Sequence, residues 1–181
     1  MAGYKGVGVV FIRRLARERG AAVEQQIVDA LNDDDRRTYQ ACTATAWVPI
    51  EFVVRLALTA APLLFPKDPA PLDRLGRALA LDNMGGIYAY LVRVLTVEFI
   101  ARQSAGLWRV YHDEGEARTE TLGPRAVRFA IRGYQQMPAD FRRYMRAFVA
   151  QLIEMTGARG VEVVPDDDDD SWGYRITWSA R

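Results

Sequence analysis

The chain has 181 residues, half of them apolar and about a quarter charged, with a net charge of +1. This length and composition predict one globular domain, residues 1–181, with an ordinary apolar core. The near-neutral net charge gives no reason to expect binding to nucleic acid or to an anionic membrane surface. A lone cysteine, Cys42, excludes an intramolecular disulfide or a thiolate metal cluster.

The first residues and the longest apolar stretch are where a targeting signal and a membrane span would be expected. The first residues lack the long apolar core of a signal peptide. The longest apolar stretch, between Arg55 and Lys67, is shorter than the ~20 residues that cross a bilayer. We therefore expect a cytoplasmic protein without a membrane span.

The first hundred residues predict helices. Apolar side chains recur on one helical face, as at Val23, Ile27 and Leu31, and Gly20 ends the first segment. The segment from Ile87 to Gln103 is apolar on most sides, which is typical of a central, buried helix. The predicted helices cover residues 8–20, 21–32, 33–42, 47–66, 72–81 and 87–103.

The remaining residues predict a sheet and one helix. Alternating residues over Leu107–His112 and 117–122 indicate a hairpin with Gly115 in its turn. Val127, Phe129 and Ile131 share one face of a third strand. A helix over 138–156 has an expected core stripe, and the segments 160–164 and 172–178 form a last hairpin. The stripe consists of Phe141, Met145, Phe148, Leu152 and Met155.

The element order predicts an α+β fold. A helical N-terminal part, residues 1–104, packs on a C-terminal antiparallel sheet, residues 105–181. The sheet has four to five strands and one covering helix, 138–156.

Five consecutive aspartates, Asp166–Asp170, stand where the last hairpin turns. They lack the alternating ligands, Gly and terminal Glu of an EF-hand calcium loop. Adjacent residues of an extended segment point in opposite directions, so the run forms no preformed cage. A solvated turn is favoured over an acidic patch for a basic partner.

Several other residues have both a structural and a functional interpretation. His112 is the sole histidine, at an expected exposed strand end, where a general base is conceivable but disfavoured. Cys42 fits a buried, inert thiol. Two arginine groups, each at helical spacing, are solvated faces or docking surfaces. These groups are Arg13, Arg14 and Arg17, and Arg142, Arg143 and Arg146.

Aromatic side chains alternate in the last strand, at Trp172, Tyr174 and Trp178. They form either part of the core, which we favour, or an exposed adhesive patch.

The pieces KGVGVVFIRRL, LWRVY, AVRFAIRGY and YRITW, in this order, resemble the haem nitric-oxide/oxygen-binding (H-NOX) domain. The same core is shared by subunits of the TRAPP trafficking complex and by 4-vinyl-reductase-type domains. The stretch LFPKDPAPLDRLGRALAL is similar to a family of uncharacterised bacterial paralogues.

This chain departs from the resemblance at the haem motifs. Haem-binding members carry an axial histidine on the long helix, at a place that corresponds to Arg93 or Val94 here. They also carry a Tyr-x-Ser-x-Arg motif for the propionates, which corresponds to Ile131, Gly133 and Gln135. We therefore expect no haem and no other cofactor.

The resemblance implies a pocket between the helical part and the sheet. Its expected residues are Arg93, Val94, Val97, Ile131, Tyr134 and Cys42. A buried Arg93 needs a partner, either a ligand anion or, as we favour, an internal carboxylate such as Glu98 or Glu51. Cys42 is also a possible counterpart of the acylated cysteine of some trafficking relatives.

Two functions follow as hypotheses. The first is a non-catalytic sensory, signalling or adaptor domain whose pocket binds a small apolar or acyl ligand. The second is an assembly subunit that forms a homodimer or binds a protein partner. A hydrolase or reductase is disfavoured, because no catalytic constellation is recognisable.

Overall fold

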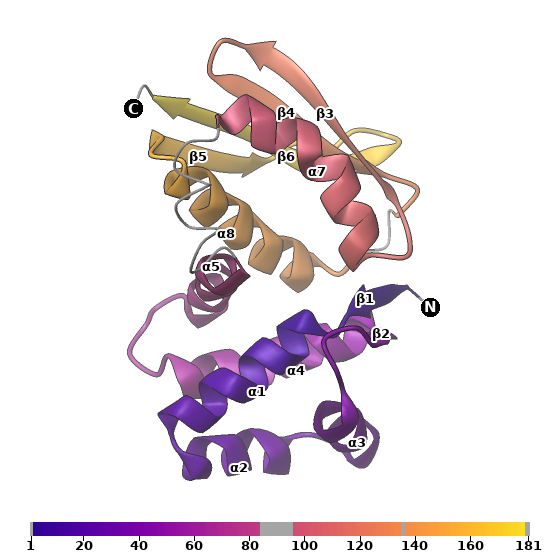
Figure 1. Cartoon of the computed structure of the whole chain (residues 1–181), viewed down its shortest axis with the longest axis vertical. Coiled ribbons are helices and arrows are strands. Elements are labelled where there is room, and N and C mark those ends of the chain that lie inside the picture. The colour runs from indigo at the N-terminus through magenta and orange to yellow at the C-terminus, as the bar shows by residue number, and fades with distance from the viewer. Residues whose placement is uncertain (1, 84–95, 135–136, 180–181) are drawn as a thin grey trace. The chain divides into compact units, whose positions relative to one another are not determined.

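The computed structural model describes residues 2–83, 96–134 and 137–179, and these form an α+β structure (Figure 1). The chain divides into two compact units, Met1–Leu75 and Gly76–Arg181. The first unit is mainly helical and the second carries a four-stranded antiparallel sheet. The predicted fold class is confirmed, and the single domain over residues 1–181 stays a prediction.

In the first unit, three helices pack on one another and a two-stranded antiparallel sheet pairs Gly3 with Pro49. The helices of this unit follow the predicted order, but its two strands were not predicted, and Trp47–Pro49, expected to begin a helix, form the second strand. In chain order the elements are β1 (Gly3–Lys5), α1 (Val7–Arg19), α2 (Ala21–Ala30), α3 (Asp33–Ala41), β2 (Trp47–Pro49) and α4 (Ile50–Leu64).

Local signals explain where these helices begin and end. Gly20, with φ of 121°, separates α1 from α2 in a conformation that favours glycine. The side-chain oxygen of Asn32 accepts a 2.9 Å hydrogen bond from the Asp35 backbone N–H and caps α3. Asp35 is buried and binds Arg55 through two hydrogen bonds of 2.7 Å. This pairing and capping anchor the start of α3.

The second unit contains a sheet with the strand order β3-β4-β6-β5. Helix α5 (Pro71–Asn83) enters this unit at Gly76. The further elements of the unit are, in chain order, α7 (Val97–Tyr111), β3 (Glu116–Gly123), β4 (Ala126–Arg132), α8 (Ala139–Met155), β5 (Arg159–Pro165) and β6 (Ser171–Ser179).

Helices α7 and α8 cover the same face of this sheet (Figure 1). The register places Phe129 beside Tyr174, and Ile131 beside Trp172, on that face. Trp108 of α7 contacts Phe129 and Trp172, and the Tyr174 hydroxyl donates a hydrogen bond to the Arg142 carbonyl of α8. The predicted inward face of β4 and the core position of Trp172 and Tyr174 are confirmed. Trp178, which was expected with them, is half-buried.

The strand predicted over Leu107–His112 is wrong, because these residues complete α7 and its C-cap. The side chain of Thr96 caps α7 by accepting from the Phe99 N–H. A helical path places Trp108 and His112 one turn apart, so both rings reach the core. A six-residue apolar alternation does not distinguish a strand from a helix end.

Because Leu107–His112 belong to α7 and its C-cap, the predicted hairpin turn at Gly115 is also wrong. Gly115, with φ of 80°, connects α7 to β3, and the first hairpin turns between Gly123 and Ala126. A Cβ at Gly115 would lie 2.9 Å from the Ile131 Cγ2 atom, so the position also needs glycine for space.

The predicted core stripe of α8 is partly right. Phe141 and Leu152 are buried, whereas Met145, Phe148 and Met155 are half-buried. Tyr144, Ala147, Ala150 and Ile153 complete the buried set. A Cβ at Gly76 of α5 would overlap the Tyr144 carbonyl oxygen, so α5 lies directly on the backbone of α8. This second contact widens the buried face beyond one stripe.

Candidate functional site

Of the predicted pocket residues in the second unit, the structure brings Ile131 and Tyr134 together. Val97, Ile131 and Tyr134 are buried in the second unit, and a Cβ at Gly115 would touch both Ile131 and Tyr134. Trp172 donates a 2.7 Å hydrogen bond from its indole nitrogen to the Tyr134 carbonyl. Arg93 and Val94 lie outside the described residues.

Cys42 belongs to the first unit, at the C-terminal end of α3. A Cβ at Gly6 would overlap its sulfur and the Thr43 carbonyl oxygen, so the thiol is enclosed by backbone. Desolvation raises the pKa of the Cys42 thiol, with the nearby Arg13 opposing the shift. A thiol with this burial and pKa carries little nucleophilic thiolate, in agreement with the structural interpretation.

His112 is the centre of an aromatic cluster rather than an exposed strand end. Its ring stacks on Trp108 with centroids 3.6 Å apart and planes 4° from parallel. The Phe141 ring meets it edge-on, with centroids 5.8 Å apart. Only 5% of His112 is exposed, and desolvation lowers its pKa to about 3. The expectation of an exposed histidine is therefore wrong, because the helix end turns the ring inward.

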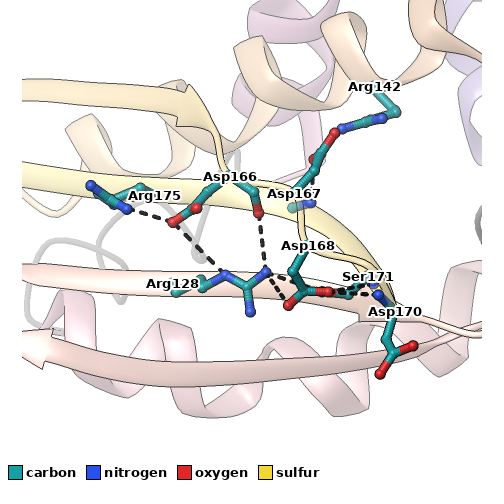
Figure 2. Close-up of polar contacts among 9 residues, drawn as sticks. Arg128, Arg142, Asp166, Asp167, Asp168, Asp170, Ser171 and Arg175 are labelled. Carbon is teal, nitrogen blue, oxygen red and sulfur yellow. Dashed lines mark hydrogen bonds and ion pairs between the residues drawn. The ribbon is translucent and has the colours of Figure 1, made fainter.

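The aspartate run forms an ordered turn between β5 and β6 (Figure 2). Oδ1 of Asp168 accepts hydrogen bonds from the backbone N–H of Asp170 at 2.9 Å and of Ser171 at 2.6 Å. It also accepts from the Ser171 hydroxyl at 2.8 Å, and these contacts, the hydroxyl first, lower the pKa of Asp168 to about 2. The carboxylate thereby fixes the turn.

Successive aspartates point in opposite directions, as the extended segment predicts. Asp166 and Asp168 bind Arg128, and Asp166 also binds Arg175, across the strands β4 and β6 (Figure 2). Asp167 points the other way and binds Arg142 of α8, which lowers the pKa of the Asp167 carboxyl.

The solvated-turn prediction is confirmed for the exposed end of the run, at Asp169 and Asp170. It is incomplete for Asp166, Asp167 and Asp168, whose carboxylates attach the turn to the sheet and to α8. Among the residues that the structure describes, no group of three or more His, Cys, Asp or Glu side chains is arranged to hold a metal ion.

The two arginine groups are engaged within the chain. Arg13 donates to the carbonyls of Tyr39, Gln40 and Cys42 at 2.7, 3.0 and 2.9 Å and so caps α3. Arg17 pairs with Glu24 at 2.9 Å. Arg142 lies 5.0 Å from the Trp172 ring centroid while it binds Asp167.

The outward face of α7 is a feature that the sequence reasoning missed. Phe99, Leu107 and Val110 are 40%, 38% and 55% exposed. Of these, only Phe99 belonged to the helix 87–103 that was expected to be buried, because Leu107 and Val110 were expected in a strand. A groove of about 220 Å³ runs along one flank of the helix, between Glu98 and Arg102 on α7 and Thr119 and Thr121 on β3. The signal was present in the sequence as a helix that is apolar on two opposite faces.

Within the described parts of the chain, each helix is too short or too polar to cross a membrane.

Comparison with protein families gives a match over residues 7–179 to the family described as "Protein of unknown function (DUF2378)". A search of curated proteins gives no match.

Solved structures of H-NOX proteins share the fold at low sequence identity. The Fe(II) unliganded H-NOX protein from K. algicida is 11% identical, with 98% of this chain and 97% of that chain covered and a TM-score of 0.65. A Cs H-NOX mutant with the unnatural amino acid 4-cyano-L-phenylalanine is 14% identical, with 97% of each chain covered and a TM-score of 0.63. An oxygen-binding H-NOX domain related to soluble guanylate cyclases, as an oxygen complex, is 11% identical, with 97% and 93% covered and a TM-score of 0.60. The chain therefore has an H-NOX-like fold.

Proposed function

The chain belongs to the DUF2378 family, and from that premise we propose that it is a non-catalytic sensory or adaptor domain that uses an H-NOX-like fold without haem. The observation that carries this proposal is the position of His112. It is the only histidine of the chain, and its ring is enclosed in the aromatic cluster of Trp108, Phe141 and their neighbours.

The described residues do not fit a haem group. A histidine ligand must present a ring nitrogen that haem iron can approach, but His112 is 5% exposed and covered on one face by Trp108. The thiol of Cys42 is buried against Gly6 and has a raised pKa. At the positions that match the propionate motif, Ile131 and Gly133 offer no side-chain hydrogen-bond donor, and Gln135 lies outside the described residues.

The same observation supports a role without catalysis. A general base must reach a substrate proton directly or through one water molecule. His112 is withdrawn from solvent, and its pKa of about 3 is far from neutral pH. The ligand that we propose for a sensory role is a small apolar or acyl molecule, because Val97 and Ile131, two residues of the expected pocket, have apolar side chains.

Titration of the purified full chain with hemin tests the proposal, followed by optical spectra in the Soret region. We expect the spectrum of free hemin, with no sharp band that saturates at one equivalent. An H-NOX protein treated in parallel provides the positive control. A saturating Soret band that disappears in the variant His112→Ala would overturn the proposal, since it would show that the imidazole reaches iron.

A second candidate function, an assembly subunit, is favoured by the exposed apolar face of α7. Native mass spectrometry of the full chain separates the two functions. A monomer that retains a small mass supports the sensory domain, and a dimer without an added mass supports the assembly subunit. The two outcomes differ because a ligand changes the mass by hundreds of daltons, whereas self-association doubles it.

A further inference from the structure

We infer that the outward face of α7 is a self-association surface, on which the α7 helices of two copies of this chain pack antiparallel. This inference rests on the assembly function proposed above and names its partner and its contact.

Two of the exposed apolar residues of α7, Phe99 and Val110, lie on one stripe, and the third, Leu107, lies outside it. Phe99, Gln103, Gly106 and Val110 follow one another at intervals of four, three and four residues, which keeps them on one side of a helix. We call these four residues the α7 stripe. The opposite side of the helix carries Trp108, which is buried against the sheet. The stripe therefore points away from the sheet.

The α7 stripe is symmetric about its middle. Phe99 and Val110 are its large apolar ends, and Gln103 and Gly106 lie between them. In an antiparallel pair, Phe99 of each copy meets Val110 of the other. A Cβ at Gly106 would meet nothing within 4 Å, so the backbone is open to a second helix at the crossing point. Two-fold interfaces require this kind of self-complementary surface.

Charges on one flank select the antiparallel direction. Glu98 lies in the first turn of α7 and Arg109 in the last turn. In an antiparallel pair each Glu98 lies near Arg109 of the other copy, which gives two ion pairs, and the helix dipoles oppose each other. A parallel pair would place like charges together. Arg102, midway along the helix, and Glu98 also line the groove toward β3.

The contact is short, so the dimer should be weak. One stripe of about three turns is smaller than the ~800 Å² per partner of a standard interface. We therefore expect a monomer–dimer equilibrium within the micromolar range, detectable by sedimentation equilibrium of the full chain between about 5 and 200 µM.

The test uses Val110→Asp with Leu58→Asp as its matched control. Both residues are exposed apolar positions on helices, 55% and 42% exposed, and Leu58 lies on α4. We expect Val110→Asp to weaken dimerisation at least tenfold and Leu58→Asp to leave it unchanged. Circular dichroism verifies that both variants fold.

A charge exchange then tests the direction of packing. Glu98→Arg and Arg109→Glu should each weaken the dimer severalfold, and the double variant should restore it, since the reciprocal pairs are rebuilt with reversed sign. Loss of the dimer in the double variant would overturn the antiparallel arrangement.

The outcomes distinguish the surface from the function. A dimer that survives Val110→Asp leaves the assembly function standing and overturns the α7 surface. A monomer at every concentration overturns both the surface and homodimeric assembly.

Discussion

At the residue scale, His112 shows how packing changes the chemistry of a side chain. Trp108 and Phe141 exclude water from the imidazole, and desolvation lowers its pKa from 6.5 to about 3. The native state therefore holds a neutral ring, whereas the unfolded chain binds a proton below pH 6.5. Between these two pKa values, acid favours the unfolded state.

We predict that the free energy of unfolding falls as the pH falls below 6.5, with a slope of up to about 1.4 kcal/mol per pH unit from this residue. The variant His112→Phe retains an aromatic ring but cannot bind the proton. Urea unfolding of both proteins at pH 7.5 and pH 5 should show a loss for the native sequence that exceeds the loss for the variant by about 2 kcal/mol. Equal pH dependence in the two proteins would contradict the assignment.

Within the acidic run, packing also gives Asp168 a role that its neighbours do not have. From the sequence alone, five aspartates differ only in position. The structure separates them, because Asp168 accepts three hydrogen bonds in its own turn, while Asp167 reaches Arg142 on another element. A hydrogen-bonding role of this kind depends on which way each residue points in the finished hairpin.

At the element scale, two glycines inside helices have opposite surroundings. A Cβ at Gly76 of α5 would overlap the Tyr144 carbonyl oxygen and lie 3.3 Å from the Ala147 Cβ atom. A Cβ at Gly106 of α7 would touch nothing within 4 Å. Sequence reasoning treats both as weak positions in a helix, and only packing separates them.

We predict that Gly106→Ala raises the free energy of unfolding by about 0.5–1 kcal/mol, since alanine restricts the unfolded chain and favours a helix. Gly76→Ala should lower it by about 1–3 kcal/mol, because α5 must move away from α8. Thermal unfolding of both variants at low protein concentration provides the measurement, and each variant is the control for the other. A stabilised Gly76→Ala would show that the two helices pack less closely.

At the scale of the whole molecule, the sheet defines the most protected part of the second unit. Strands β4 and β6 are central, and β3 and β5 lie at the edges. Both central strands contribute rings to the face that α7 and α8 cover, through Phe129 and Tyr174. The free energy of local opening should therefore be greatest in the centre of the sheet.

Hydrogen exchange measured by mass spectrometry checks this order. We expect peptides from β4 and β6 to exchange roughly tenfold or more slowly than peptides from β3 and β5, since each edge strand bonds to one neighbour only. Uniform exchange across the four strands would contradict it.

Much of the fold could be predicted from the sequence, and the errors have physical causes. The helix ends at Gly20 and before Gly157 and the alternation of β4 depend on nearest neighbours along the chain. The strand expected over Leu107–His112 was wrong because its short apolar pattern suits a strand and a helix end equally well. Contact with the sheet decides in favour of the helix.

The sequence by itself determined the α+β class, most helix boundaries, the inward face of the sheet and the turn at the aspartates, since all of these depend on local pattern. Tertiary structure alone decided that His112 is enclosed by rings, that Asp167 binds Arg142, and that α7 keeps an exposed apolar face. The physical reason is that pKa, ion pairing and exposure depend on neighbours that are distant along the chain, and folding alone brings those neighbours together.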